Sequence, residues 1–199
     1  MQVTKAFRIN GAIFNRLLFM SLLEANDFIM QKKILSAREH YDFIDLKGNK
    51  LGEADANIIQ IPPKFVVLDT HGLELMHLQG KTFSLHREFT LYNPSGEEIG
   101  TIKRKIAKFI GEEFWVEKNG LEFMRIFGDF TEHEYQIEVE GAPVASIHRK
   151  WVTLRDQLGV SITGNVDHLV VIAAVIVIEH GEVTERQTSS GSGNFNNRF

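Results

Sequence analysis

The sequence predicts a mainly β domain, in which about twelve antiparallel strands close into a barrel around a buried hydrophobic helix near the C-terminus. A short N-terminal helix is also predicted. Three observations support this fold. Short alternating or β-branched runs fill residues 28 to 163, with turn signals every eight to twelve residues. Parts of this region repeat, and an uninterrupted apolar run from Leu169 to Ile178 follows it.

Length and composition favour a single domain. The chain has 199 residues, and its 43% of hydrophobic residues can fill a sizeable core. A net charge of -4 gives no global attraction to nucleic acid or anionic lipid, so any such contact needs a local basic patch. Because the chain has no cysteine, it has no disulfide framework or thiolate nucleophile. This composition suits a reducing compartment, and we expect a cytoplasmic protein.

Residues 1–27 are expected to form an N-terminal extension with an amphipathic helix over residues 12–25. Arg16 interrupts the apolar middle of this segment, which argues against a signal peptide. The main hypothesis is that the helix packs on the domain, and the alternatives are docking to a membrane surface or a protein partner. Apolar residues recur there at helical spacing: Ile13, Phe14, Leu17, Leu18 and Leu22.

An internal repeat organises the β region. The runs GLELMHLQG (72–80) and GLEFMRIFG (120–128) match at six of nine positions when leucine and isoleucine count as alike. GEEIGTIKRK (96–105) and GAPVASIHRK (141–150) share glycine, isoleucine and Arg-Lys in register. A weaker copy begins at Tyr41. Units starting near Tyr41, Phe89 and Tyr135 therefore hold two hairpins each.

The last of these units lacks a fourth strand, and the early run DFIMQKK is predicted to fill that place. The total is then about twelve strands, a number expected to curl or close because closure removes exposed edges. A barrel of that size is too wide for side chains alone to fill, since about eight strands is the limit for such filling. Something else must occupy the centre.

The apolar run supplies this centre as a helix over residues 167–180. Seven of its ten residues are β-branched, which favours a strand. Asn165 or Asp167 can cap the start of a helix, however, while His180 and Gly181 suit its end. A strand of this length would reach about 46 Å, whereas a helix spans about 21 Å.

A helix that is apolar on every side must be buried on every side. Ten apolar residues are too few to cross a bilayer, which needs about twenty, so no transmembrane segment is predicted. The helix is therefore expected to thread the barrel, with its polar ends near the two mouths. The barrel domain is assigned to residues 28–183, and the Gly/Ser/Asn-rich residues 184–199 are predicted to be a disordered tail.

These features resemble a known family. A Tyr-x-Ile start before a glycine turn, the run PVASIHRKWVTLRDQLGVSI (143–162) and the Asp-led apolar segment (167–178) resemble the LURP-one-related family. That family belongs to the tubby C-terminal-like and phospholipid-scramblase-like superfamily, and the resemblance covers residues 28–182. It implies a twelve-stranded barrel around a hydrophobic helix.

The resemblance also implies a non-enzymatic protein whose relatives bind phosphoinositides, move phospholipids or take part in defence signalling. The chain lacks the acidic calcium loop and the further hydrophobic segment of scramblases. No tubby motif is present that would transfer binding positions residue by residue. Calcium-driven scrambling is therefore not expected.

The candidate binding site for an anionic lipid headgroup consists of basic residues near two strand ends. In a strand, Lys103 and Lys105 face one side and Arg104 the other. Two such ends side by side could hold a phosphate through charge-assisted hydrogen bonds. The alternative is that these cations only protect strand ends and keep the barrel in solution. The candidate residues are Lys103, Arg104, Lys105, Lys108, His148, Arg149 and Lys150.

Other chemistry finds little support in the sequence. No His-x-His or His-x-x-x-His pattern occurs, so no metal site is predicted, and no cofactor is expected. No catalytic or nucleotide-binding motif is present, and a nucleic-acid partner is not expected. The second functional hypothesis is a signalling or scaffold protein that acts through protein contacts. The third is an enzyme acting on a small ligand or by hydrolysis at a barrel mouth, near Asp167 or His180.

Overall fold

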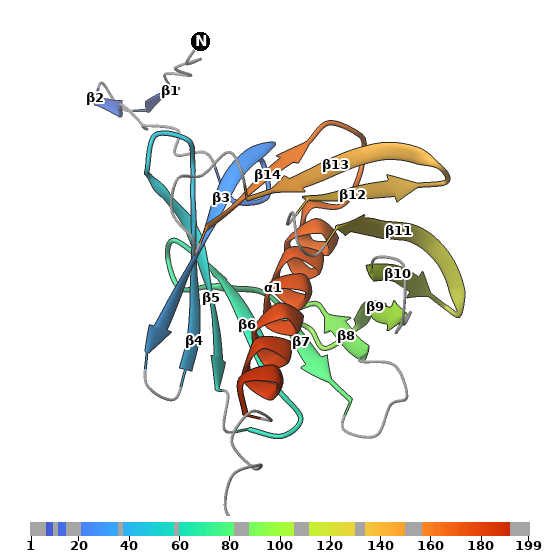
Figure 1. Cartoon of the computed structure of the whole chain (residues 1–199). Helices are drawn as coiled ribbons and strands as arrows, with labels where there is room; N and C mark the ends of the chain where they lie inside the picture. The colour runs from blue at the N-terminus through green and yellow to red at the C-terminus, as the bar shows by residue number, and fades with distance from the viewer. Residues whose placement is uncertain are drawn as a thin grey trace, which may run out of the picture.

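The computed structural model describes a closed twelve-stranded antiparallel barrel with one helix through its centre (Figure 1). The mainly β fold predicted from the sequence is therefore confirmed. The structure describes residues 7–9, 12–14, 21–35, 38–57, 60–81, 88–105, 112–129, 134–149 and 157–191.

The elements follow one another along the chain as a series of hairpins and a final helix. A separate two-stranded sheet precedes the barrel and consists of β1 (Phe7–Ile9) and β2 (Ala12–Phe14). The barrel strands are β3 (Asp27–Leu35), β4 (Arg38–Ile44), β5 (Lys50–Asn57), β6 (Lys64–Asp69), β7 (Glu74–Gly80), β8 (Glu88–Tyr92), β9 (Glu98–Lys105), β10 (Glu112–Lys118), β11 (Leu121–Asp129), β12 (Glu134–Val139), β13 (Ala142–His148) and β14 (Gln157–Ile162). The helix is α1 (His168–Gly191).

The three predicted units appear in the strand order. Strands β4 to β7, β8 to β11 and β12 to β14 each form a continuous antiparallel run, and β3 pairs with β14. The early run DFIMQKK thus takes the place of the last unit's fourth strand, as predicted. In this register Phe28 lies opposite Val160, and the pairing closes the barrel.

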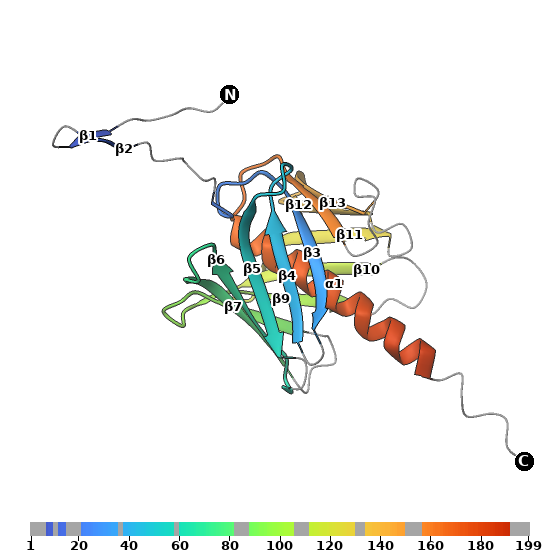
Figure 2. The ribbon, with the colours of Figure 1, turned by 90° about the vertical axis from the view of Figure 1, so that its left-hand side faces the viewer.

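The barrel has two different mouths. Because all neighbouring strands are antiparallel, the odd-numbered strands from β3 to β13 end at one mouth and the even-numbered strands end at the other. The mouth where the even-numbered strands end is called the turn mouth, since tight turns join β4 to β5 and the later hairpins there. Helix α1 starts at this mouth and leaves the barrel at the opposite one, the exit mouth, as Figure 2 shows.

Three of the tight turns are built alike. The Asp45 carboxylate accepts hydrogen bonds from the backbone N–H groups of Lys47 and Asn49, both at 2.8 Å. Asp69 makes the equivalent bonds in the next hairpin and Asn93 makes one in the hairpin after it. A glycine with positive φ follows three residues after each of these caps. The hairpins therefore repeat every 24 residues, a finer period than the four-strand unit inferred from the sequence.

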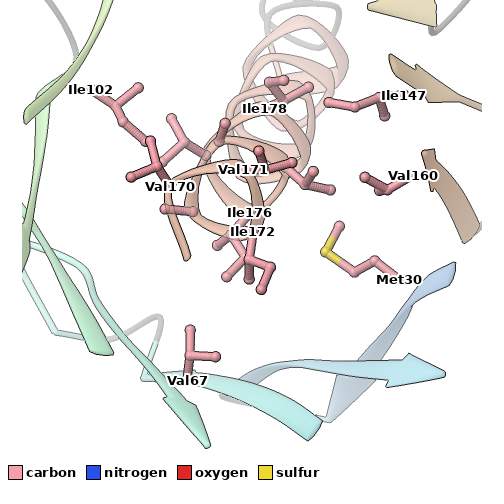
Figure 3. Close-up of a cluster of buried hydrophobic side chains, with 14 of the residues drawn as sticks. Met30, Val67, Ile102, Ile147, Val160, Val170, Val171, Ile172, Ile176 and Ile178 are labelled. Atoms are coloured by element: carbon pink, nitrogen blue, oxygen red, sulfur yellow. The ribbon is translucent and has the colours of Figure 1, made fainter. Parts of the chain in front are cut away.

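The core lies between the helix and the inner wall of the barrel. Every residue from Val170 to Glu179 is buried, which confirms the prediction of a helix shielded on all sides. Figure 3 shows Val171, Ile172 and Ile176 facing wall side chains such as Met30 and Val67. Packing of apolar surface against a closed wall explains why a β-branched segment is helical here: tertiary burial outweighs local propensity.

The helix starts as predicted but ends later. Asp167 is the N-cap, and its carboxylate accepts a hydrogen bond from the N–H of Leu169 at 2.9 Å. The helix does not end at Gly181 and continues to Gly191, so residues 184–191 of the predicted disordered tail are helical. Gly181 is buried close to the Arg104 guanidinium, and Glu, Arg and Gln among the next residues favour helix. Residues 192–199 lie outside the described part.

The predicted N-terminal helix over residues 12–25 is not seen in the described residues. Ala12–Phe14 form a strand paired with β1, and residues 21–26 form a turn, while residues 15–20 lie outside the described part. Leu22 and Ala25 are fully buried in the turn, and Leu22 packs against Gly52 of β5. Part of the apolar spacing that suggested a helix thus serves to cover the turn mouth.

Candidate functional site

The predicted basic residues come to the same mouth but not to neighbouring strands. Strand β9 ends with Lys103, Arg104 and the backbone of Lys105. Strand β13 ends at His148, directly before Arg149, so both sets lie at the exit mouth. Strands β10, β11 and β12 separate β9 from β13 in the wall. The side chain of Lys105 is not described, and Lys108 and Lys150 lie outside the described residues.

Lys103 and Arg104 face opposite sides of β9, as predicted. Lys103 points outward, and its ammonium group lies 2.6 Å from a carboxylate oxygen of Glu117 on β10. Arg104 points inward and is buried, with its guanidinium carbon 5.8 Å from the centre of the Phe114 ring. Arg104 therefore lines the lumen, whereas Lys103 belongs to a surface ion pair.

Arg149 also turns into the lumen. Its Nη2 donates a hydrogen bond to Glu179 Oε2 at 2.8 Å, and both side chains are largely buried. Glu179 belongs to the last fully buried turn of α1, just before the position where Arg104 approaches Gly181. Two guanidinium groups from β9 and β13 thus approach the same turn of the helix.

A second set of polar groups meets this turn from β3 and β4. Glu39 Oε2 accepts hydrogen bonds from the Tyr41 hydroxyl at 2.9 Å and from His180 Nδ1 at 3.1 Å. The Lys32 ammonium lies 3.5 Å from the other Glu39 oxygen. Burial raises the pKa of Glu39, but the His180 hydrogen bond and the Lys32 charge outweigh it and lower the pKa overall. Glu39 is therefore held in its charged form.

Aromatic rings complete this side of the mouth. The His180 ring packs edge-on against Phe65 and Phe89, at 5.1 and 5.8 Å between ring centres. Burial and the neighbouring Glu39 charge raise the pKa of Tyr41 well above its ordinary value, so its hydroxyl remains a donor. The two phenylalanine rings and the Glu39 carboxylate fix the position of the His180 side chain.

These groups together form the exit-mouth cluster: Lys32, Glu39, Tyr41, Arg104, Arg149, Glu179 and His180. It contains one lysine, two arginines and two carboxylates, so basic side chains outnumber acidic ones even without His180. Guanidinium groups bind carboxylate and phosphate in the same bidentate geometry, so the cluster that now holds Glu179 also has the donors that suit a phosphate.

Sequence reasoning found only part of this cluster. Arg104, Arg149 and His180 were singled out, but the roles of Lys32, Glu39 and Glu179 were missed. One signal was available for β4, because Glu39, Tyr41 and Phe43 alternate on one face in a strand that is otherwise polar. A carboxylate in line with two inward aromatic residues indicates a buried ion pair.

A different group of polar residues lies on the outer wall, across β4 and β5. His40 pairs with Asp55, and Asp42 pairs with Glu53, in the strand register. His40 Nδ1 lies 2.9 Å from Asp55 and Nε2 lies 3.1 Å from Asp42. Both ring nitrogens face carboxylates, which favours the doubly protonated ring. Burial lowers the pKa of His40, but these two hydrogen bonds outweigh it and raise the pKa.

His40, Asp42 and Glu53 have ligand atoms within 4.8 Å of one another and are the one metal-capable group found among the described residues. The sequence predicted no metal site, because the spacing of residues along one segment does not show which side chains meet across two strands. Ammonium groups already occupy these oxygens: Lys33 contacts Asp42, and Lys50 contacts both Asp42 and Glu53. These bonds hold the pKa of Asp42 well below its usual range despite burial.

The two mouths carry different charge. The described turn-mouth residues contain ten Asp or Glu and three Lys, counted over 21–27, 45–50, 69–74, 93–98, 118–122, 139–143 and 163–168. The described exit-mouth residues contain seven Asp or Glu and nine Lys or Arg, counted over 31–35, 38–40, 56–57, 60–64, 79–81, 88, 103–105, 112–113, 128–129, 134, 148–149, 157 and 179–181. In its described residues, the barrel is therefore acidic at one end and mildly basic at the other.

Comparison with known proteins assigns the fold to a family. A family model described as LURP-one-related matches residues 26–179, which is most of the chain and includes the whole barrel. The chain belongs to the LURP-one-related family. This match confirms the resemblance that the sequence motifs indicated.

A solved structure agrees with this assignment. The X-ray structure of an Arabidopsis thaliana protein resembles this LURP-one-related chain with a TM-score of 0.57 and 19% sequence identity. The match covers 77% of this chain and 90% of the Arabidopsis chain, and it shows a shared fold. No curated protein sequence matches the chain significantly. Within the described residues, no helix is both long enough and apolar enough to cross a membrane.

Proposed function

We propose that this LURP-one-related protein is a non-catalytic barrel module that binds anionic phospholipid headgroups at its exit mouth. The resemblance to the tubby-like and scramblase-like superfamily supports a lipid ligand. Under this proposal the protein is cytoplasmic and binds to the membrane surface, and the barrel stays outside the bilayer.

The observation that carries the proposal is the convergence of Arg104 and Arg149 at one mouth. They come from the same position in two repeat units, and both lie against the end of α1. The exit-mouth cluster has more basic than acidic side chains, and the described residues of the turn mouth are mainly acidic, so the two ends of the barrel differ in charge. An anionic surface would attract the exit mouth and repel the turn mouth.

The cluster suits binding better than catalysis. It contains no serine, threonine or cysteine that could act as a nucleophile beside His180, whose ring bonds to Glu39. Its guanidinium groups can exchange a carboxylate partner for a phosphate, since both accept two parallel hydrogen bonds. Outward cations such as Lys103 add attraction to the membrane surface at longer range.

The test is co-sedimentation of the full chain with vesicles of phosphatidylcholine, alone and mixed with phosphatidylserine or a phosphoinositide. Binding should require the anionic lipid. A Lys103→Gln/Lys105→Gln variant should bind these vesicles roughly ten- to thirtyfold more weakly, because each lysine near an anionic surface contributes about 1 kcal/mol. Lys103 lies on the outside of β9, and strand alternation predicts the same side for Lys105, so the fold should be retained.

The matched control is Lys47→Gln/Lys118→Gln, which removes the same charge from exposed residues of the turn mouth. This variant should bind like the unchanged protein. Equal binding to neutral and anionic vesicles would refute the lipid proposal. Equal losses in the two variants would show attraction through net charge alone and would refute the assignment of binding to the exit mouth.

A further inference from the structure

Exposed leucines lie at the hairpins of the turn mouth. Leu46 and Leu73 belong to two of its connections, and Leu121 begins β11 directly after a third; they are 70%, 65% and 73% exposed, and Leu23 on the preceding turn is 39% exposed. Four of the five large hydrophobic residues exposed in the described part of the chain are thus at this mouth. Carboxylates outnumber lysines there by ten to three. Exposed leucines among carboxylates suit a partner that is both apolar and cationic.

The chain contains such a segment directly before this mouth. Residues 1–20 include Lys5, Arg8 and Arg16 but no aspartate or glutamate. Their apolar residues are Met1, Val3, Ala6, Phe7, Ile9, Ala12, Ile13, Phe14, Leu17, Leu18, Phe19 and Met20. The segment joins the barrel at Ser21, where the turn over residues 21–26 buries Leu22 and Ala25 in the turn mouth. A cationic apolar segment is therefore followed directly in the chain by the turn that belongs to the acidic turn mouth.

The described part of this segment needs a surface to pack on. Strands β1 and β2 have three residues each and pair only with each other, with Phe7 opposite Phe14. An isolated two-stranded hairpin is at best marginally stable in water, so such a short one needs further apolar contacts. Figures 1 and 2 place this hairpin on the side of the turn mouth.

We propose that residues 1–20 dock on the turn mouth of the same chain, with their cations against its carboxylates and their apolar side chains against its exposed leucines. A short linker makes docking within one chain effective, because it gives an effective concentration in the millimolar range. Docking covers the leucines at the end of the barrel where α1 begins. This inference does not depend on lipid binding at the exit mouth.

The absence of cysteine from the chain allows a clean test by engineered disulfide formation. In the full-length Phe14→Cys/Leu46→Cys protein, the equilibrium between the intramolecular disulfide and mixed disulfides with glutathione gives the effective concentration of the two thiols. We expect this concentration to fall at least tenfold when Lys5→Gln, Arg8→Gln and Arg16→Gln are added. Leu73→Ser/Leu121→Ser should also lower it, since it removes apolar contacts at the mouth.

The position control is Phe14→Cys/Ile61→Cys. Ile61 is 80% exposed but belongs to the exit mouth, so its pair should form little intramolecular disulfide. Equal effective concentrations with and without the three cations and the two leucines would refute docking, because tethering alone would then explain the cross-link. Disulfide-linked dimers in place of the intramolecular product would assign the mouth to a second copy and overturn the proposal. Thermal unfolding of each variant verifies that the barrel is unchanged.

Discussion

The two mouths hold the two ends of the same helix in different ways. At the turn mouth α1 begins with an exposed Asp167 cap, among tight turns whose carboxylates accept backbone hydrogen bonds. At the exit mouth the helix passes through buried charges, with Glu179 bound to Arg149 and His180 bound to Glu39. The first end is defined by local sequence, and the second by contacts between residues far apart in the chain.

This difference shows how a featureless apolar helix acquires a fixed position. Between the mouths α1 is apolar on every side, and any rotation or sliding would exchange one apolar contact for another. Buried ion pairs add little net stability, but a mismatched one is costly, so they select one arrangement. We infer that the exit-mouth cluster sets the register of α1 and that the apolar middle supplies most of its stability.

The largest effect is expected between the mouths, at Ala173. This side chain is fully buried, and Ala173→Asp would place a carboxylate without a partner in the lumen. The cost should be several kcal/mol, enough to unfold much of the population. Chemical denaturation followed by circular dichroism measures it. Ala142→Asp, at an exposed position of β13, is the control and should change stability by less than about 0.5 kcal/mol. A fully stable Ala173→Asp protein would rule out the central helix.

A smaller but still large effect is expected at the exit mouth. Glu179→Ala leaves the buried Arg149 without its carboxylate, which should destabilise the fold by about 3–5 kcal/mol. Replacing both residues by methionine should cost clearly less, because neither charge of this pair is then left buried. Urea unfolding of the two variants gives the comparison.

The surface ion pair of Lys103 and Glu117 is the control for this effect. Both partners are more exposed than those of the buried pair, and Lys103→Ala should cost about 1 kcal/mol or less. If Glu179→Ala were as mild as Lys103→Ala, or the double methionine variant as damaging as Glu179→Ala, the exit-mouth cluster would not control the position of the helix.

The sequence predicted the barrel well because its signals are local and repeated. Turn residues such as Asp45 and the alternating strands define hairpins, and the copies in three units give their number. The pairing of β3 with β14 also followed, since one unit lacked a strand that the early run could supply. The helix followed from length and capping, although Val and Ile dominate its composition.

The exit-mouth contacts could not be predicted, because they depend on register. In β13 the neighbouring Val144 and Ala145 are both buried beside a shift in the pairing with β12, so alternation along the strand is interrupted there. A shift of one residue decides whether Arg149 faces the lumen or the solvent. The end of α1 was misplaced for a related reason: Gly181 suggested a cap, but its place beside Arg104 keeps it inside the barrel.

The smallest effect is expected at the turn mouth, where Asp167 caps the helix. Asp167→Ala removes the acceptor for the N–H of Leu169, and loss of an N-cap costs about 1 kcal/mol. Asn165→Ala is the matched control, because the sequence offered Asn165 as the other cap and it is exposed; its cost should stay below about 0.5 kcal/mol. Urea denaturation can rank these variants against Glu179→Ala. An Asp167→Ala cost equal to that of Glu179→Ala would mean that both ends fix the helix equally, and the distinction between a locally capped end and a register-setting end would fail.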